Sequence, residues 1–550
     1  MSAFDRQEVP QLREKYYGLR SDFGKIKASL ALAAGLPKFF QDRITLQRAE
    51  EQVKRLLDSR VERFLDLVRA RIYEAPANPY RRLLKSAGCE FSDLQTHLQR
   101  HGLKKTLVRL ASEGVYLTSD EFKGKTEVRR GKESFRVSPA DFDRRDASAG
   151  FTIQSSGSRN RPVDTFSPLE WRTLHSMAEA VFYSAHNLFA SAHAVYEPII
   201  AGRMLFTLIN GKLGIPTDRW FALNVAVHSA AEDRYHYLNA RLVAAMARWC
   251  GVGIANPQYL NTGEIKPILD WISEKRNEGK TCCIQTVVSN ALRIARMALH
   301  TGTSLQGTTF TASGEPLTQS KRSMIEKPGA RVVLRYGPGG GNGASLGCGN
   351  PHFTDEVHVP ESMFTFVEHP KPLDDSDPPI YPLMLTTLHP AAPRFLLNVQ
   401  NGDYATMTRR DCGCALERVG FTQHLHTIRS FEKLTTEGMN YFTTDIVELL
   451  ENTIPSEFGG GSGDYQLIEE EDNSGQTRLT LLVHPNVSGL NEETLLFRLR
   501  QNLAEGSRNN RFMSKIWQNA GAFRIRREAP HASARGKILP LRRMMGKEQV

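Results

Sequence analysis

The chain has 550 residues, 40% of them hydrophobic and 24% charged, which is the composition of an ordinary globular protein. At about 150 residues per domain, this length predicts between two and four domains. With 42 glycines and 27 prolines, the composition excludes a disordered or collagen-like chain.

The apolar segments and the cysteines bear on where such a protein resides. No uncharged apolar segment reaches the roughly 18–20 residues that a membrane span needs, because Arg203 and Lys212 interrupt the range 199–215. The N-terminal segment lacks the basic and then apolar pattern of a secretory leader. Seven cysteines are an odd set that argues against a disulfide framework. We therefore expect a cytoplasmic protein without a membrane partner.

The net charge is +11, and the range 523–550 holds eight Lys and Arg residues against two Glu. A basic tail of this kind can bind nucleic acid, but this one has no interleaved aromatic residues and no recognition-helix pattern. A polyphosphate ligand or an acidic protein explains the charge equally well. We do not expect a nucleic-acid partner.

Residues 1–115 are predicted to be mostly helical and to pack on the domain that follows. In the range 46–73, apolar residues recur at spacings of three and four with charges between them, which predicts an amphipathic helix. A shorter helix is predicted from an N-cap at Ser92 to a stop at Gly102.

Residues 116–431 are predicted to form a large α/β domain. Helices are expected over 171–190 and 289–302, with a Pro- and Asp-rich loop over 373–382. Between them lie short β-rich runs, and this alternation is typical of parallel strands. The runs cover 151–156, 282–288, 308–313, 331–337 and 394–399.

Residues 432–550 are predicted to form a smaller α+β domain. A helix over 443–454 precedes a glycine-rich break at 459–463. Two strands, 465–471 and 477–485, are expected to form a hairpin, and a further helix begins near Asn491.

The segment from Ser155 to Pro162 is a candidate phosphate loop. Small hydroxyl residues around Gly157 allow backbone N–H groups to face phosphate oxygens, while Arg159 and Arg161 add positive charge. The segment lacks the lysine pattern of a P-loop. An ordinary Ser- and Gly-rich turn is the alternative.

Two more residues, Asp403 and Lys537, are candidates for an active site. Asp403 follows the predicted strand 394–399, and a carboxylate at the carboxyl end of such a strand can accept hydrogen bonds from ribose hydroxyls. Lys537 follows a glycine in a basic loop, from which its ammonium can extend into a neighbouring active site. An ordinary turn and a solvated surface charge are the respective alternatives.

Cys412 and Cys414 form a Cys-x-Cys pair, with Cys348 and several histidines upstream. Two thiolates at this spacing can share a metal ion, and tetrahedral zinc needs two further ligands. Two free thiols in a loop are the alternative.

The order of these motifs, over roughly residues 80–540, resembles the adenylate-forming enzymes, and most closely the branch of phenylacetate–CoA ligases and acyl-protein synthetases. The resemblance implies a large domain with mixed sheets and a small mobile C-terminal domain. It also implies nucleotide contacts from the phosphate loop, an adenine turn, a Tyr-Gly motif and a ribose-binding acid. These are Ser155, Ser156, Gly157, Ser158 and Arg159, then Gly314, Glu315 and Pro316, then Tyr336 and Gly337, and finally Asp403.

The family's hinge pattern is an Arg, an acid three residues later and a Gly-x-Asn-x-Phe segment. Arg429, Glu432 and residues 438–442 match it without a gap. The resemblance implies that Arg429 contacts the ribose and takes part in catalysis, that Glu432 is the hinge, and that Lys537 is the mobile catalytic lysine.

The same branch often holds a structural zinc through a Cys, a His and a Cys-x-Cys pair. The resemblance assigns these ligands in order, with His352 competing for the place of His358. The four are Cys348, His358, Cys412 and Cys414.

Two departures concern the phosphates. Val163 replaces the lysine that ends the family's phosphate loop, and Gly340 replaces the acid that helps to hold Mg²⁺. The implied activity is the ATP- and Mg²⁺-dependent conversion of a carboxylic acid to an acyl-AMP. The acyl group then passes to a thiol of CoA, a carrier protein or a protein cysteine, and residues 220–310 are expected to line the acid pocket. The departures motivate an alternative, a protein of this shape that has lost turnover and acts as a binding module.

Overall fold

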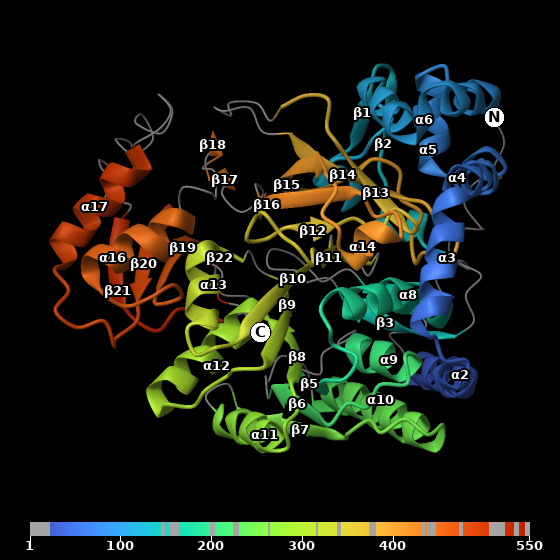
Figure 1. The fold of residues 1–550 in the computed structure, drawn as a ribbon. Helices are drawn as coiled ribbons and strands as arrows, with labels where there is room; N and C mark the ends of the chain where they lie inside the picture. Colours follow the sequence, from blue (N-terminus) through green and yellow to red (C-terminus); the bar gives the residue numbers. More distant parts are fainter. Residues whose placement is uncertain are drawn as a thin grey trace.

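The computed structural model describes the chain in segments that cover most of the sequence. They are residues 22–144, 149–154, 164–197, 204–223, 230–261, 264–314, 317–337, 343–372, 381–430, 435–436, 439–440, 447–471, 477–504, 523–532, 538 and 540–544. The fold is α/β, with a large mixed sheet, many helices and a smaller C-terminal body, as the sequence predicts (Figure 1).

One half of the large sheet is parallel. Its strands are β5 (Ala192–Tyr196), β6 (Arg219–Leu223), β7 (Pro257–Leu260), β8 (Cys282–Val287), β9 (Thr308–Ser313) and β10 (Arg331–Tyr336). They lie in the order β7-β6-β5-β8-β9-β10, so the chain begins in the middle, runs to one edge and returns to build the other side. The point where the direction reverses, between β5 and β8, is where such sheets open a crevice at the carboxyl ends of their strands.

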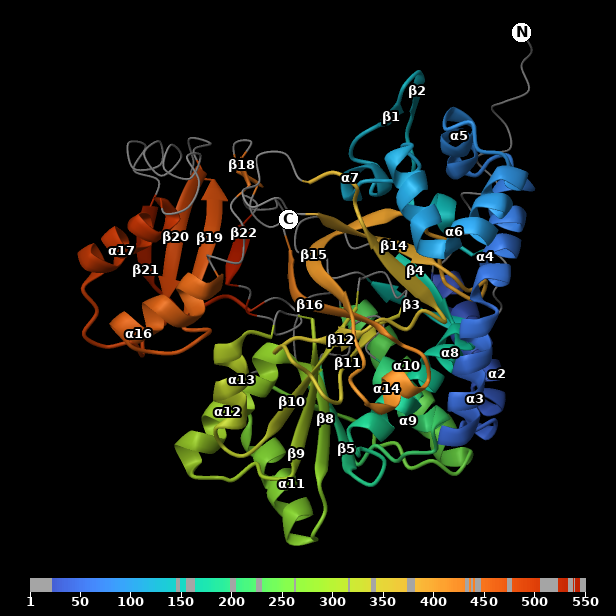
Figure 2. The same ribbon diagram turned by 45° about the horizontal axis from the view of Figure 1, so that its top comes forward.

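Helices cover both faces of this parallel half (Figures 1 and 2). One face carries α8 (Leu169–Ala185), α9 (Leu205–Lys212) and α10 (Ala230–Trp249), and the other carries α11 (Lys266–Asn277), α12 (Val288–Thr301) and α13 (Gln319–Glu326). Because both faces are covered, the central strands are buried along their whole length; every residue of β5 and β8 is buried.

The other half of the sheet is antiparallel. It consists of β11 (Ser345–Gly347), β12 (Val357–His358), β13 (Phe364–Glu368), β14 (Pro382–Thr387), β15 (Val399–Arg409) and β16 (Gln423–Ser430). Beyond β10 the order is β11-β12-β16-β15-β14-β13. A short helix, α14 (Ala415–Arg418), lies between β15 and β16 in the chain.

The N-terminal helices line the edge of the large body (Figure 1). They are α2 (Asp22–Gln41), α3 (Leu46–Asp58), α4 (Arg60–Val68), the π-helix η2 (Arg69–Tyr73), α5 (Pro79–Ser86), α6 (Phe91–Ser112) and α7 (Ser119–Phe122). Leu57 of α3 shares a core with Val181 of α8, and Leu107 of α6 shares one with Phe366 of β13. These N-terminal helices therefore share core contacts with the helices and strands of the large body.

The helix predicted over 46–73 is present as α3, α4 and η2, with a break at Ser59. The predicted helix end at Gly102 is confirmed, because Gly102 has non-helical angles, a φ of 76° and a ψ of 172°. The range of α6 therefore consists of two helices that meet in a kink at Gly102, and the second runs to Ser112. Buried Leu103 and Leu107 continue the apolar face in the second of these helices.

The C-terminal body has a sheet and a core of its own. It contains the π-helix η4 (Leu449–Thr453), α16 (Ile454–Phe458), β19 (Tyr465–Glu471), β20 (Thr477–Val483), α17 (Glu492–Ala504), β21 (Phe523–Arg527) and β22 (Leu541–Met544). The predicted hairpin of β19 and β20 is confirmed, and the parallel strands β21 and β22, which were not predicted, add one strand to each side. None of the described helices combines the length and the apolar composition that a bilayer crossing requires.

Candidate active site and metal centre

Two predicted nucleotide motifs follow neighbouring parallel strands. Ser313, the last residue of β9, pairs with Arg335 of β10, so Gly314 and Gly337 lie at the same carboxyl edge of the sheet. Gly314 has a φ of 86°, a left-handed conformation that glycine adopts without steric cost. Glu315 and Pro316 lie outside the described residues.

Tyr336, at the end of β10, is joined to β15 by two hydrogen bonds. Its hydroxyl donates to Oδ2 of Asp403 at 2.9 Å and accepts from Nδ2 of Asn401 at 2.6 Å. Burial raises the pKa of Tyr336 well above its ordinary value, and the adjacent Asp403 carboxylate raises it further. The phenol therefore stays protonated and serves as a fixed donor to Asp403.

The Asp403 prediction was wrong about secondary structure. Asp403 lies inside β15, with β14 on one side and β16 on the other, and residues 394–398 before it are not a strand. Gly402, with a φ of 79°, bends β15 at this point instead of ending it. The Asn-Gly-Asp sequence has the composition of a turn, but the two flanking strands supply ladder partners that the local sequence does not reveal.

Arg429 lies in the strand next to Asp403. In the register of β15 and β16, Asp403 is opposite Ser430 and Tyr404 is opposite Arg429. The next pair is Thr406 with His426, so β16 has one more residue than β15 between the two pairs, which is a β-bulge. The structure thus brings the backbones of Asp403 and Arg429 together; the Arg429 side chain lies outside the described part.

The bulge is held by a buried acid. Thr427 has a φ of 54°, which is uncommon for a β-branched residue. The carboxylate of Asp355, 4% exposed, accepts from the N–H of Thr427 at 2.8 Å and from the N–H of Ile428 at 2.9 Å. Asp355 therefore fixes the backbone that leads directly into Arg429.

The remaining predicted site residues lie outside the described part of the chain. They are Ser155, Ser156, Gly157, Ser158, Arg159, Arg161, Val163, Gly340, Glu432 and Lys537. The ends of the phosphate-loop motif are described: β3 (Gly150–Gln154) and β4 (Asp164–Pro168) pair with each other, Gln154 opposite Asp164. The motif therefore connects two antiparallel strands, and α8 follows directly after β4.

The four predicted metal ligands come together. The candidate ligand atoms of Cys348, His358, Cys412 and Cys414 all lie within 4.8 Å of one another, whereas His352 is not in this group. Nε2 of His358 is 3.5 Å from Sγ of Cys412 and 3.3 Å from Sγ of Cys414. Nδ1 of His358 donates to the carbonyl of Phe421 at 2.5 Å, which turns Nε2 toward the thiols.

The electrostatics of this cluster favour a thiolate at Cys414, whereas the neighbouring Cys414 raises the pKa of the Cys348 thiol. A hydrogen bond from Cys348 lowers the pKa of the Cys414 thiol, and contact with His358 lowers it further. Burial opposes the charged form of His358, but hydrogen bonds with Cys412 and Cys414 outweigh it and raise the pKa of His358 to about 9. Three thiols and one imidazole are a donor set that tetrahedral zinc accepts, so the residues fit the predicted metal.

A second group surrounds these donors, and the sequence analysis missed it. Oε1 of Glu356 lies 2.6 Å from Nδ1 of His424 and accepts from Nε of Arg410 at 2.7 Å. Nη2 of Arg410 in turn lies 3.6 Å from Sγ of Cys348. Burial raises the pKa of Glu356, but these contacts lower it well below its ordinary value overall. Glu356 is therefore a buried anion that orients a cation, Arg410, beside the candidate metal ligand Cys348.

Asn401 was also missed as a site residue. It stands two positions before Asp403, and this spacing in a strand places two side chains on one face. Its Oδ1 accepts from the backbone N–H of Asp403 at 3.3 Å, so it contacts both members of the Tyr336–Asp403 pair. The period-two spacing was the available signal.

No protein-family model and no curated protein sequence matches this chain. Among solved structures, it is similar to 2-hydroxyisobutyryl-CoA ligase in the postadenylation state with 2-HIB-AMP, at 13% identity, a TM-score of 0.49 and coverage of 92% of this chain and 91% of that chain. The chain is also similar to the anthranilate-CoA ligase AuaEII with anthranoyl-AMP, at 12% identity and a TM-score of 0.39, with 74% of this chain and 66% of that chain covered. An acyl-CoA synthetase from Brucella canis has 15% identity and a TM-score of 0.31, with 72% of this chain and 64% of that chain covered. Such low identities and TM-scores do not assign this chain the reaction of any of these proteins.

Proposed function

We propose that the chain activates a carboxylic acid with ATP as an acyl-AMP and transfers the acyl group to a thiol. The observation that carries this proposal is the Tyr336–Asp403 hydrogen bond, which holds a carboxylate beside the carboxyl edge of β9 and β10. The predicted adenine turn begins at that edge with Gly314. An acceptor for ribose hydroxyls next to an adenine segment is what a nucleotide site requires.

The binding roles follow from the donors and acceptors. A carboxylate offers about four lone-pair sites, so Asp403 can accept from Tyr336 and from a ribose hydroxyl together. Asn401 and Tyr336 orient the Asp403 carboxylate, and the bulge held by Asp355 sets the position of Arg429, the second proposed ribose contact.

In the first half-reaction, a carboxylate oxygen of the acid forms a bond to the α-phosphorus while the bond to pyrophosphate breaks. Two negatively charged groups must approach, so the rate depends on alignment and on neutralising charge. We assign this role to Lys537 and Arg429. The family's Mg²⁺ acid is replaced by Gly340, which offers no side-chain ligand, so we assign no step to the ion.

In the second half-reaction, a thiol sulfur attacks the acyl carbonyl and AMP leaves with the electron pair of its phosphate–acyl bond. Coenzyme A, a carrier-protein pantetheine and a protein cysteine are the candidate acceptors. We keep residues 432–550 as the small domain that changes orientation between the two steps, with Glu432 as hinge, and residues 1–115 and 116–431 as the remaining parts. The range 220–310, which includes β8 and α12, is the proposed wall of the acid pocket.

Zinc bound by Cys348, His358, Cys412 and Cys414 would be structural and would supply no chemistry to the reaction. Its ligands come from the segment after β11, from β12 and from the loop after β15. Asp355 and Glu356 are consecutive, and the first holds the bulge before Arg429 while the second orients Arg410 beside Cys348. The metal centre and the backbone of Arg429 thus share one support.

The alternative is a protein that binds nucleotide without turnover and acts on a partner. Two replacements favour it, Val163 for the phosphate-loop lysine and Gly340 for the Mg²⁺ acid. Exchange of radiolabelled pyrophosphate into ATP across a panel of carboxylic acids separates the two functions. Acid-dependent exchange supports the ligase, and nucleotide binding without exchange supports the binding module.

A further inference from the structure

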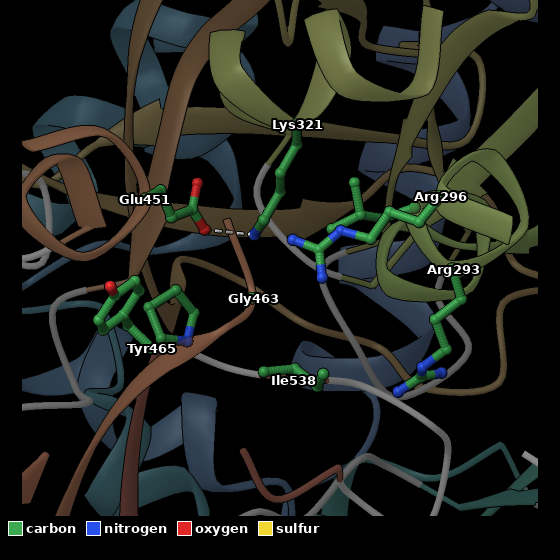
Figure 3. Close-up of a pocket in the computed structure, with 9 residues that line it drawn as sticks. Arg293, Arg296, Lys321, Glu451, Gly463, Tyr465 and Ile538 are labelled. Atoms are coloured by element: carbon green, nitrogen blue, oxygen red, sulfur yellow. Dashed lines mark ion pairs between the residues drawn. The ribbon is translucent and has the colours of Figure 1, made fainter. Parts of the chain in front are cut away.

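A buried ion pair joins the C-terminal body, called the small body from here on, to the large body. Nζ of Lys321, on α13, lies 2.5 Å from Oε1 of Glu451, on η4, and their side chains are 4% and 2% exposed. Figure 3 shows the two side chains pointing toward each other, with Arg296 reaching in beside them from α12. Burying a charge away from water costs free energy unless its partner is present. The ion pair therefore forms only when the two bodies are arranged as they are here.

A second contact lies next to the ion pair. Arg296 donates through Nη2 to the carbonyl of Ser462 at 2.5 Å and through Nη1 to Oδ1 of Asp464 at 3.2 Å. The glycine-rich break before β19 makes room for it, because a Cβ on Gly461 would lie 2.8 Å from Nη2 of Arg296. The glycine-rich break at 459–463 thus contacts α12 through Ser462.

Thr318 connects this contact to the predicted adenine segment. It is the N-cap of α13, accepts from the N–H of Lys321 at 3.4 Å, and donates its hydroxyl hydrogen to Oε2 of Glu451. It stands four residues after Gly314. Both oxygens of Glu451 therefore bind the start of one helix, at the end of the segment assigned to adenine.

A small gap lies at this junction among the described residues. It is lined by residues that include Arg293, Lys321, Tyr465 and Ile538, and its volume is about 30 Å³. A single water needs about 10–15 Å³ on this measure, so the gap outlined by the described residues has room for one or two waters. Lys321 and Arg296 contact the small body here.

We propose that Thr318, Lys321 and Glu451 form a latch through which the segment after Gly314 controls the position of the small body. The latch is closed in the orientation described here and opens when the small body turns. The identity of the ligand that acts on the latch, a nucleotide, rests on the proposed function; the latch itself does not. Coupling between two sites is reciprocal. If a nucleotide shifts the latch between its closed and open states, then a substitution that opens the latch must also change the affinity for the nucleotide.

The test measures the distance between the bodies. Spin labels carried by non-canonical amino acids at Asn277 on α11 and Glu493 on α17, both exposed, leave the native cysteines untouched. Pulsed electron resonance then gives the distance distribution of the full chain with and without AMP. We expect one dominant distance in the wild-type protein and a broadened or second population in Lys321→Met.

Two further variants exclude simple misfolding as the cause. Glu451→Gln is isosteric and neutral, and it should give the same redistribution with a native circular dichroism spectrum. The charge exchange Lys321→Glu with Glu451→Lys should return the wild-type distance. Lys104→Met is the matched control, because Lys104 pairs with Glu361 at 3.2 Å within the large body; it should leave the distance unchanged.

A calorimetric titration with AMP tests the coupling. We expect Thr318→Val and Lys321→Met to change the AMP affinity by about fivefold or more, in the range of ordinary allosteric coupling. Folded variants whose distance distribution equals that of the wild-type chain would overturn the latch, whatever the nucleotide does. If the wild-type chain binds no AMP, the proposed function fails while the distance measurement still decides the latch.

Discussion

The Tyr336 hydroxyl binds Oδ2 of Asp403 at 2.9 Å, although the two residues belong to β10 and β15, which are separated in the sheet by β11, β12 and β16. In a flat sheet, four steps of about 4.8 Å would place those strands about 19 Å apart. The antiparallel half must therefore curl back over the carboxyl edge of the parallel half. This closure turns two distant motifs into one side-chain cluster.

Removing this carboxylate should weaken nucleotide binding. Hydrogen bonds to charged groups contribute about 1.5–3 kcal/mol, so Asp403→Ala should reduce AMP affinity roughly 10- to 100-fold. Tyr336→Phe should have a smaller effect, because it leaves the acceptor and removes only its orienting donor. Isothermal titration measures both. Thr406→Ala, at an exposed position of the same strand, is the control, and an Asp403→Ala affinity equal to that of the control would refute the ribose role.

Metal analysis should find about one zinc per chain. Cys412→Ser combined with Cys414→Ser removes two of four ligands and should abolish its retention on gel filtration. Cys250→Ser, at a half-buried cysteine elsewhere, should keep it. Zinc retained by the double variant would show that the cluster is not the site.

The bulge before Arg429 should depend on Asp355. Asp355→Ala leaves two buried N–H groups without their acceptor and should lower the free energy of unfolding by about 2–4 kcal/mol. Thr427→Gly removes the cost of a left-handed β-branched residue, so it should make the Asp355→Ala loss smaller. Urea unfolding of the four proteins in this double-mutant cycle measures the coupling. Strictly additive losses would contradict the link between the acid and the bulge.

Acid should destabilise the fold through His193. Burial lowers the pKa of His193 to about 4, against about 6.5 in an unfolded chain. Between these values the unfolded state binds a proton that the native state does not, so stability falls as the pH falls, by about 1.4 kcal/mol per pH unit. Between pH 7 and pH 5, the free energy of unfolding of His193→Gln should therefore fall by about 2 kcal/mol less than that of the wild-type chain. His300→Gln, at an exposed position, should behave like wild type; the same behaviour in His193→Gln would contradict this assignment.

The sequence predicted the elements whose signal is local. Strands β9 and β19 coincide with the predicted 308–313 and 465–471, because apolar β-forming residues there are bounded by turn residues. The α/β class followed from the same alternation. The Cys-x-Cys pair indicated a metal site by its spacing, but the full set of four residues came only through the family resemblance, since Cys348 and Cys412 lie far apart in the chain.

The failures have a common physical origin in tertiary contacts. Asn401 to Asp403 read as a turn, yet β14 and β16 pair on both sides of β15. Glu451 and Lys321 are ordinary helix charges in the sequence, and only the packing of the two bodies buries them together. A pattern confined to neighbouring residues contains none of this information.

The most direct test of the central claim is ATP–pyrophosphate exchange with a panel of aliphatic and aromatic carboxylic acids. The ligase account predicts exchange that depends on at least one of these acids. It also predicts that the exchange rate of Lys537→Ala falls by a factor on the order of 10²–10³ while its circular dichroism spectrum stays native. Thr406→Ala should exchange at the wild-type rate. A chain that binds AMP and ATP but exchanges pyrophosphate with none of the acids would contradict the account and identify a binding module.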